Sequence, residues 1–198
     1  MTDAPRRQIG LFGGSFNPPH VCHVLATAWA LQTQPLDEVW WMPTYQHAFG
    51  KDLAPYDDRL ELCRLATRDL SRVHVHDIER RMGGESRTID TVRALMAEHP
   101  DCDLWLIVGT DILGERHKWK DWDGLMRLVR LIVVGRSGYE AFAAGDAHSP
   151  GFSLPQVSST AIRQALRTPD DPASVELVNA WVQRDVAAYV RTNHLYQP

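Results

Sequence analysis

Short apolar runs alternate with longer segments of helical periodicity along most of this chain. The apolar runs have the length of buried strands and occupy residues 9–12, 39–42, 73–76, 104–108 and 131–134. Between them, apolar residues recur at helical spacing after Pro19, after Pro55 and over residues 88–98. Strands that alternate with helices are typical of a parallel sheet. The pattern therefore predicts an α/β fold, a Rossmann-like doubly wound parallel sheet with helices on both faces.

The last third of the chain follows a different pattern. Residues 152–157 suit a short strand, whereas residues 159–166 and 182–191 have helical periodicity. Residues 139–150 are rich in Gly, Ala and Ser, which indicates a surface loop. Neither a repeat nor a domain boundary is apparent. We expect one domain over residues 1–198, ending in a helical C-terminal extension.

Composition narrows the class of protein. The 198 residues are 44% hydrophobic and 23% charged, with a net charge of -4, and these values are near those of ordinary folded proteins. No dense Lys/Arg run is present, so we expect no nucleic-acid partner and only a local anion site. The N-terminal segment lacks the length of a signal-peptide core or membrane helix, which favours a cytoplasmic protein without membrane contact. Three widely spaced cysteines indicate reduced thiols, with Cys63 and Cys102 in the core.

The first predicted strand runs into a glycine-rich loop that suits a phosphate. Gly13 and Gly14 let the backbone approach a ligand closely, and Ser15 adds a polar contact. His20 and His23 stand three residues apart at the start of the next helix, so both imidazoles can face this loop. The loop lacks Gly-Lys-Ser/Thr and GxGxxG, which argues against a Walker loop and a dinucleotide fingerprint. The alternative interpretation is that the glycine pair only forms a tight turn and that both histidines lie on a helix surface.

A second segment, residues 157–163, offers a further anion site. Ser159 and Thr160 can cap a helix whose N-terminal amides attract anions. Arg163, expected in the first turn of that helix, carries several donors for a phosphate. Taken alone, the segment is more simply an ordinary helix cap followed by a solvated arginine.

The two segments together resemble the signature of the nucleotidylyltransferases. Residues 13–23 are similar to the family loop Gly-Gly-Ser/Thr-Phe-Asp/Asn-Pro-x-His-x-Gly-His, with Cys22 where the family usually has glycine. Residues 157–163 are similar to its Ile-Ser-Ser-Thr-x-Ile-Arg motif. The resemblance implies that His20, His23 and Arg163 are catalytic. It also implies an ATP-binding set that consists of Gly13, Gly14, Ser15, Phe16, Gly109, Asp111, Ser158, Ser159 and Thr160.

Other segments resemble the bacterial nicotinate-nucleotide adenylyltransferases. They are residues 41–43, the loop with His47 and Lys51, residues 86–91, residues 109–111, Trp119-Lys120 and residues 136–138, where Ser137 departs from the commoner residue types. The resemblance implies that Asp111 contacts a ribose, Trp119 stacks on the pyridine ring and the Thr88 backbone helps to recognise the nicotinate carboxylate. The acceptor-binding residues that it implies are Lys51, Thr88, Trp119 and Arg136.

The reaction implied by this resemblance joins ATP to nicotinate mononucleotide. The phosphate of the mononucleotide attacks the α-phosphate of ATP, giving nicotinate adenine dinucleotide and pyrophosphate, and Mg²⁺ is carried by the ATP phosphates. Nicotinamide mononucleotide or another phosphorylated acceptor stays open as an alternative, as does a non-catalytic nucleotide-binding module. We expect no protein-bound metal, since His74 and His76 share one face of a strand without an apparent third ligand. The sequence also leaves room for a homo-oligomer.

Overall fold

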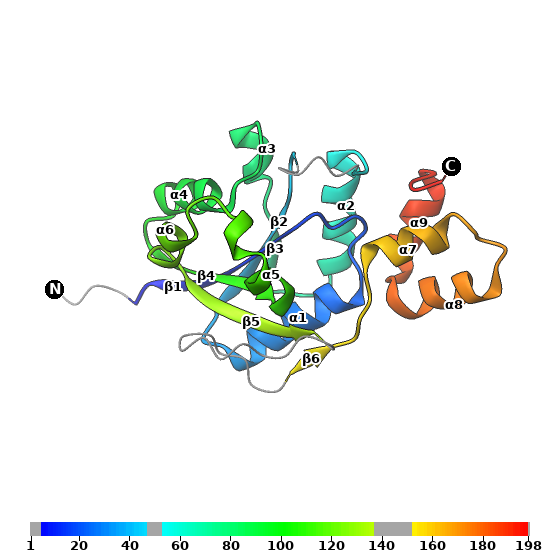
Figure 1. The fold of residues 1–198 in the computed structure, drawn as a ribbon, viewed down its shortest axis with the longest axis horizontal. Helices are drawn as coiled ribbons and strands as arrows, with labels where there is room; N and C mark the ends of the chain where they lie inside the picture. Colours follow the sequence, from blue (N-terminus) through cyan, green and yellow to red (C-terminus); the bar gives the residue numbers. More distant parts are fainter. Residues whose placement is uncertain (1–4, 47–52, 137–151, 198) are drawn as a thin grey trace.

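The computed structural model describes residues 5–46, 53–136 and 152–197. Within these ranges six parallel strands form a sheet in the order β3-β2-β1-β4-β5-β6 (Figure 1). The strands are β1 (Arg7–Gly14), β2 (Glu38–Pro43), β3 (Val73–Val75), β4 (Cys102–Gly109), β5 (Arg130–Arg136) and β6 (Ser153–Leu154). This order is that of a doubly wound sheet of the Rossmann type. It confirms the predicted fold class.

Helices cover both faces of the sheet. In the described ranges they are α1 (Val21–Thr33), α2 (Tyr56–Thr67), α3 (Ile78–Met82), α4 (Thr88–Glu98), α5 (Thr110–Gly114), the 3₁₀ turn η1 (Arg116–Lys118), α6 (Trp122–Met126), α7 (Ser159–Leu166), α8 (Pro172–Trp181) and α9 (Arg184–Thr192). Successive side chains of a strand point to opposite faces. Val39 and Trp41 of β2 share a core cluster with residues of α1, α2 and α7, whereas Trp40 and Met42 share one with α4 and α6.

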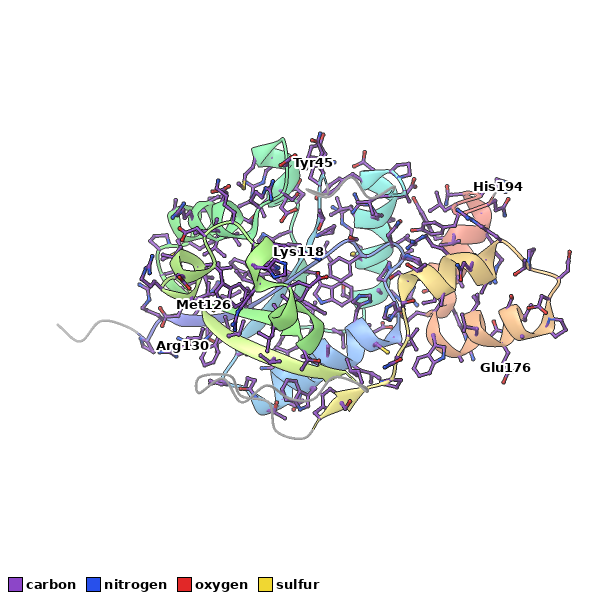
Figure 2. All side chains as sticks on the ribbon, in the orientation of Figure 1. Tyr45, Lys118, Met126, Arg130, Glu176 and His194 are labelled. Atoms are coloured by element: carbon purple, nitrogen blue, oxygen red, sulfur yellow. The ribbon has the colours of Figure 1, made fainter. Side chains whose placement is uncertain are left out.

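The C-terminal helices form an extension at one side of the molecule, beside α2 (Figure 1). Figure 2 shows Glu176 and His194 on that side and Met126 and Arg130 on the opposite side. Val186 and Val190 of α9 are buried in the same cluster as Leu62 of α2. The extension is therefore packed on the core, and the predicted helical C-terminus is confirmed.

Some predicted elements of this last third were wrong in extent. The strand expected over residues 152–157 is limited to the two residues of β6, and the helix expected over 182–191 begins only at Arg184. Helix α8 was not predicted, although Asp171 caps it by accepting the Ser174 N–H and Pro172 stands in its first turn, which are ordinary start signals. Residues 139–150, the expected surface loop, lie outside the described residues.

The strand order fixes where a ligand can bind. The chain leaves β1 toward β2 on one side, whereas β4 continues to β5 on the other, so the crevice between the carboxyl ends of β1 and β4 lies at a topological switch point. Gly13 and Gly14 end β1 at this edge, and Gly109 ends β4 beside them. None of the helices in the described ranges is long and apolar enough to cross a membrane. All three cysteines are buried and none forms a disulfide.

Candidate active site

A cleft with a volume of about 760 Å³ opens at the carboxyl ends of β1 and β4. This volume is typical of small-molecule sites. Most of the predicted site residues line it, namely Gly13, Gly14, Ser15, Phe16, His20, His23, Thr88, Gly109, Trp119, Ser159, Thr160 and Arg163. Lys51 lies outside the described residues, and the side chains of Asp111 and Arg136 are likewise not described. The fold thus brings both predicted motifs and part of the acceptor set to one cleft.

The loop after β1 is shaped by an aromatic contact. Phe16 has a φ of 44°, in the left-handed region that residues other than glycine seldom adopt. Its ring is 2% exposed and stacks on Trp41, with ring centroids 4.5 Å apart and an interplanar angle of 7°. Trp41 is itself fixed, because its indole N–H donates to the Thr27 hydroxyl at 2.9 Å. The core packing of β2 therefore sets the conformation of this loop.

His20 and His23 lie together at the start of α1. Their ring centroids are 3.9 Å apart, and His20 is 1% exposed. The backbone N–H of His20 donates to Nδ1 of His23 at 3.0 Å, so His23 caps the helix that it belongs to. An imidazole whose Nδ1 accepts a hydrogen bond carries its proton on Nε2. Nε2 of His23 is therefore the nitrogen that can donate to an anion.

The second motif is joined directly to this loop through α7. The Arg163 guanidinium donates from Nη1 to the Asn17 carbonyl at 2.8 Å and from Nη2 to the Thr160 hydroxyl at 3.2 Å. The Ser159 hydroxyl donates to the Pro18 carbonyl at 2.9 Å. Residues separated by more than half of the chain thus form one polar wall of the cleft.

Two details of this motif were predicted wrongly. The cap of α7 is Ser158, whose hydroxyl oxygen accepts the Ala161 N–H, and not Ser159 or Thr160. Arg163 is the fifth residue of α7 and belongs to its second turn. This later position lets the guanidinium reach back to the Asn17 carbonyl.

The opposite wall carries Thr88 and Trp119, two of the predicted acceptor residues. Thr88 is the first residue of α4, and a helix N-terminus presents backbone N–H groups that favour an anion. Trp119 is partly buried and contacts Trp122 edge to face, with centroids 5.6 Å apart. Figure 2 shows Lys118, which also lines the cleft, over the middle of the sheet. An aromatic surface and anion donors therefore share this wall.

Glu79 was missed by the sequence analysis. It is 9% exposed and lines the cleft. Its carboxylate accepts hydrogen bonds from the Tyr45 N–H at 3.1 Å, from the Thr91 hydroxyl at 3.2 Å and from the Ser86 hydroxyl. Burial raises the pKa of this carboxyl. Glu79 thus ties the segment after β2 to the segment that leads into α4.

Arg59 was missed as well. This residue of α2 is 1% exposed, and its guanidinium donates from Nη1 to the Ser15 carbonyl at 3.0 Å and from Nε to the Ala54 carbonyl at 2.9 Å. It supports the loop from outside the cleft. No sequence signal points to Glu79 or Arg59, because both stand in charged stretches that are typical of solvated helix faces.

Cys22 replaces the usual glycine without separating the two imidazoles. It is 4% exposed and packs in the core cluster that includes Ala26 of α1 and Leu154 of β6. Its Sγ lies 3.9 Å from the Pro155 carbonyl oxygen. Since α1 still begins at Val21, the side chain is accommodated between α1 and the segment after β6.

The described residues contain no group of three or more His, Cys, Asp or Glu side chains that could hold a metal ion. His74 lies 3.6 Å from a carboxylate oxygen of Glu38. His76 stacks on Trp40, with centroids 4.3 Å apart, and burial lowers its pKa. His74 in β3 and His76 just after it therefore make structural contacts with β2.

The family model described as cytidylyltransferase-like matches residues 11–165, and the chain belongs to this family. The matched range includes the loop after β1, the cleft and most of α7. The fold and the site thus define a nucleotidyltransferase-type domain.

Relatives of similar length show to which branch of this family the chain belongs. A protein from Anaeromyxobacter dehalogenans is 46% identical over 194 residues, which cover 96% of this chain and 97% of the relative. One from Myxococcus xanthus is 38% identical over 97% of this chain and 96% of the relative. Both are named "Probable nicotinate-nucleotide adenylyltransferase". These relatives place the chain in the nicotinate-nucleotide adenylyltransferase family.

A solved structure has the same fold. The Plasmodium falciparum nicotinic acid mononucleotide adenylyltransferase complexed with NaAD matches with a TM-score of 0.82, covering 96% of this chain and 97% of that chain. The two sequences are 16% identical, so the likeness concerns the fold.

Proposed function

We propose that this chain transfers the adenylyl group of ATP to the phosphate of nicotinate mononucleotide, releasing pyrophosphate and forming nicotinate adenine dinucleotide. The observation that carries the proposal is the direct joining of the two motifs at the switch point, where Arg163 and Ser159 bond the loop that leads to His20 and His23. The relatives at up to 46% identity support the choice of substrates.

The reaction needs alignment more than a covalent intermediate. An oxygen of the acceptor phosphate attacks the α-phosphorus of ATP in line, and the bond to the β-phosphate oxygen breaks as pyrophosphate leaves. Charge builds up on the transferring and leaving phosphates, and donors fixed beforehand stabilise it. We assign this role to His20, His23 through Nε2, and the guanidinium of Arg163.

The remaining assignments follow the two walls of the cleft. We place ATP against residues 13–16, Gly109, Asp111 and residues 158–160, with Asp111 at a ribose. On the opposite wall Trp119 stacks on the pyridine ring, and the N-terminal amides at Thr88 receive its carboxylate. Lys51 and Arg136 complete the acceptor-binding set.

Magnesium fits this site as part of the nucleotide substrate. The described residues offer no cluster of carboxylates for a protein-held ion, and magnesium commonly keeps its waters and binds through substrate phosphates. When bound, it neutralises charge on the phosphate chain. The protein residues then act on the phosphates around it.

An acceptor panel tests the proposal. The purified chain is incubated with ATP, Mg²⁺ and either nicotinate mononucleotide, nicotinamide mononucleotide or phosphopantetheine, and pyrophosphate release is followed. We expect nicotinate mononucleotide to give the highest kcat/KM, because only its ring carries a carboxylate for the α4 N-terminus. ATP binding without turnover on any acceptor would instead establish a non-catalytic nucleotide-binding module.

A further inference from the structure

Arg59 is a buried cation that serves the backbone of the loop. It is 1% exposed, and within the described part of the chain its hydrogen bonds go to the carbonyls of Ser15 and Ala54 and not to a carboxylate. Burial lowers the pKa of Arg59, yet a guanidinium stays charged in proteins. Its positive charge therefore acts on the two peptide groups whose carbonyls it contacts.

The Ser15 carbonyl belongs to the same peptide group as the Phe16 N–H. In a planar trans peptide the C=O and N–H bonds point in opposite directions. Arg59 is outside the lining of the cleft, whereas Ser15 and Phe16 are part of it. A hydrogen bond from Arg59 to the Ser15 oxygen thus directs the Phe16 N–H away from the guanidinium and α2.

This peptide differs from two others in the described loop whose carbonyls accept hydrogen bonds from side chains. Arg163 holds the Asn17 carbonyl and Ser159 holds the Pro18 carbonyl. Each of these carbonyls precedes a proline, whose nitrogen has no proton to donate. Of the three held peptides, only the one bound by Arg59 can present an N–H to a ligand.

A second contact fixes the same arrangement. Nε of Arg59 donates to the Ala54 carbonyl at 2.9 Å, and the Ala54 N–H donates to Oδ1 of Asn17 at 3.1 Å. The guanidinium also lies over the Tyr56 ring, 5.4 Å from its centroid. The start of α2 and the loop after β1 are thereby held in one geometry.

We propose that Arg59 is a positioning residue, which orients and polarises the Ser15–Phe16 peptide so that the Phe16 N–H binds a phosphate of the nucleotide. A cation on the carbonyl oxygen draws electron density from the peptide and strengthens its N–H as a donor. The identity of the nucleotide as ATP rests on the proposed function. The role of the peptide in binding an anionic phosphate chain does not depend on the proposed function.

The test compares Arg59→Met, which removes charge and donors, with Arg59→Lys, which keeps the charge but replaces the planar guanidinium by a single ammonium group. Arg64→Met is the matched control, because Arg64 lies on the same helix with a side chain 57% exposed. Calorimetry measures ATP and acceptor binding separately, and steady-state kinetics give kcat and each KM. Loss of a charged hydrogen bond predicts ATP binding about tenfold weaker or more in Arg59→Met and about threefold weaker in Arg59→Lys. Acceptor binding and the Arg64→Met protein should match the wild type.

An NMR titration supplies a readout that mere destabilisation would not give. In the ¹⁵N-labelled wild type, the Phe16 amide proton should move downfield on addition of ATP. In Arg59→Lys the movement should be smaller, and in Arg59→Met it should be absent.

Each outcome of these binding experiments supports or overturns the proposed role of Arg59. Unchanged ATP binding in Arg59→Met overturns the proposal, and so does an equal loss of ATP and acceptor binding, which would indicate a general structural role. If Arg59→Met does not fold, Arg59→Lys decides alone: wild-type ATP affinity overturns the proposal, and a selective loss of ATP affinity supports it. A wild type that binds ATP without turnover removes the proposed function but leaves the Arg59 test intact.

Discussion

The guanidinium of Arg163 donates to the backbone carbonyl of Asn17 at 2.8 Å, across 146 positions of sequence. This contact joins α7 to the loop after β1, and it makes the proposed phosphate site dependent on both halves of the chain. The same guanidinium lines the cleft, so we assign Arg163 a positioning role beside its proposed contact with a phosphate. Substitutions of Arg163 should therefore lower turnover more than they lower the stability of the fold.

Arg163→Ala should lower kcat by about 100-fold, because it removes both a charged donor near the transferring phosphate and the support of the Asn17 carbonyl. The free energy of unfolding should fall by about 1–2 kcal/mol, in line with the loss of one charge-assisted hydrogen bond at a partly buried position. Steady-state kinetics and urea unfolding measure the two effects.

Gln164→Ala is the matched control for Arg163, because Gln164 is the next residue of α7 and is exposed. It should leave kcat unchanged. Equal kcat values for Arg163→Ala and the wild type would remove Arg163 from the mechanism.

The sequence predicted the parts of this site that short motifs encode, and missed the parts that packing creates. His20, His23, Ser159 and Arg163 were identified because local spacing and resemblance point to them, and the structure brings them to one cleft. The cap of α7 was displaced by one residue, since three consecutive hydroxyl residues, 158–160, compete for it and sequence patterns leave helix ends uncertain by a residue or two.

Arg59 and Glu79 could not be found in this way. Each has charged neighbours in sequence, at Asp58 and Arg80, so their burial follows only from the packing of distant elements: Arg59 meets a carbonyl 44 residues away, and Glu79 meets a backbone N–H 34 residues away. The doubly wound class of the sheet, in contrast, was predicted from the alternation of strands and helices. Helix α8 was missed despite its Asp171 and Pro172 start signals. One domain over residues 1–198 stays a prediction.

His23 has a structural role and a proposed catalytic role, which different substitutions can separate. Its Nδ1 caps α1 by accepting the His20 N–H at 3.0 Å, and its Nε2 is assigned to the phosphate. Asparagine places an oxygen near the position of Nδ1, whereas glutamine places an amide nitrogen near that of Nε2. His23→Asn should keep the stability of the fold and lower kcat by about 100-fold. His23→Gln should retain more activity but lose about 1 kcal/mol of stability with the cap.

Thermal unfolding and kcat of both His23 variants give the comparison. The reverse ranking, with His23→Asn the more active protein, would show that the imidazole matters only as a helix cap. His74→Asn serves as the control, because His74 is an exposed histidine of β3 outside the cleft.

Trp119 should determine acceptor affinity and not the rate of the chemical step. Trp119→Ala should raise the KM for nicotinate mononucleotide by up to about tenfold, because an aromatic stacking pair contributes about 0.5–1.5 kcal/mol beyond its buried area. The KM for ATP and kcat should change little. Trp119→Phe should lie between the alanine variant and the wild type.

Trp105→Phe is the control for Trp119, since Trp105 faces Arg130 and Gln8 away from the cleft lining. An acceptor KM in Trp119→Ala equal to that of the wild type would exclude ring stacking at this position.

Glu79 makes the stability of the fold depend on pH in a defined direction. Burial raises the pKa of its carboxyl above the ordinary value of 4.5, although hydrogen bonds from Ser86, Tyr45 and Thr91 and the charge of Arg59 oppose the shift. A carboxyl with a raised pKa holds its proton more tightly in the folded chain than in the unfolded one. Its contribution to stability is therefore full below pH 4.5 and declines as the pH rises through the folded-state pKa.

Glu79→Gln cannot ionise and lacks this dependence, so the free energy of unfolding of the wild type relative to Glu79→Gln should decline as the pH rises above about 4.5. Urea unfolding at several pH values measures this difference. Glu98→Gln is the control of opposite sign, because a hydrogen bond from Arg81 lowers the pKa of Glu98, and stability from that pair is lost as the pH falls through the folded-state value. A difference for Glu79→Gln that is flat or rises with pH would contradict the assignment of Glu79 as a buried carboxyl with a raised pKa.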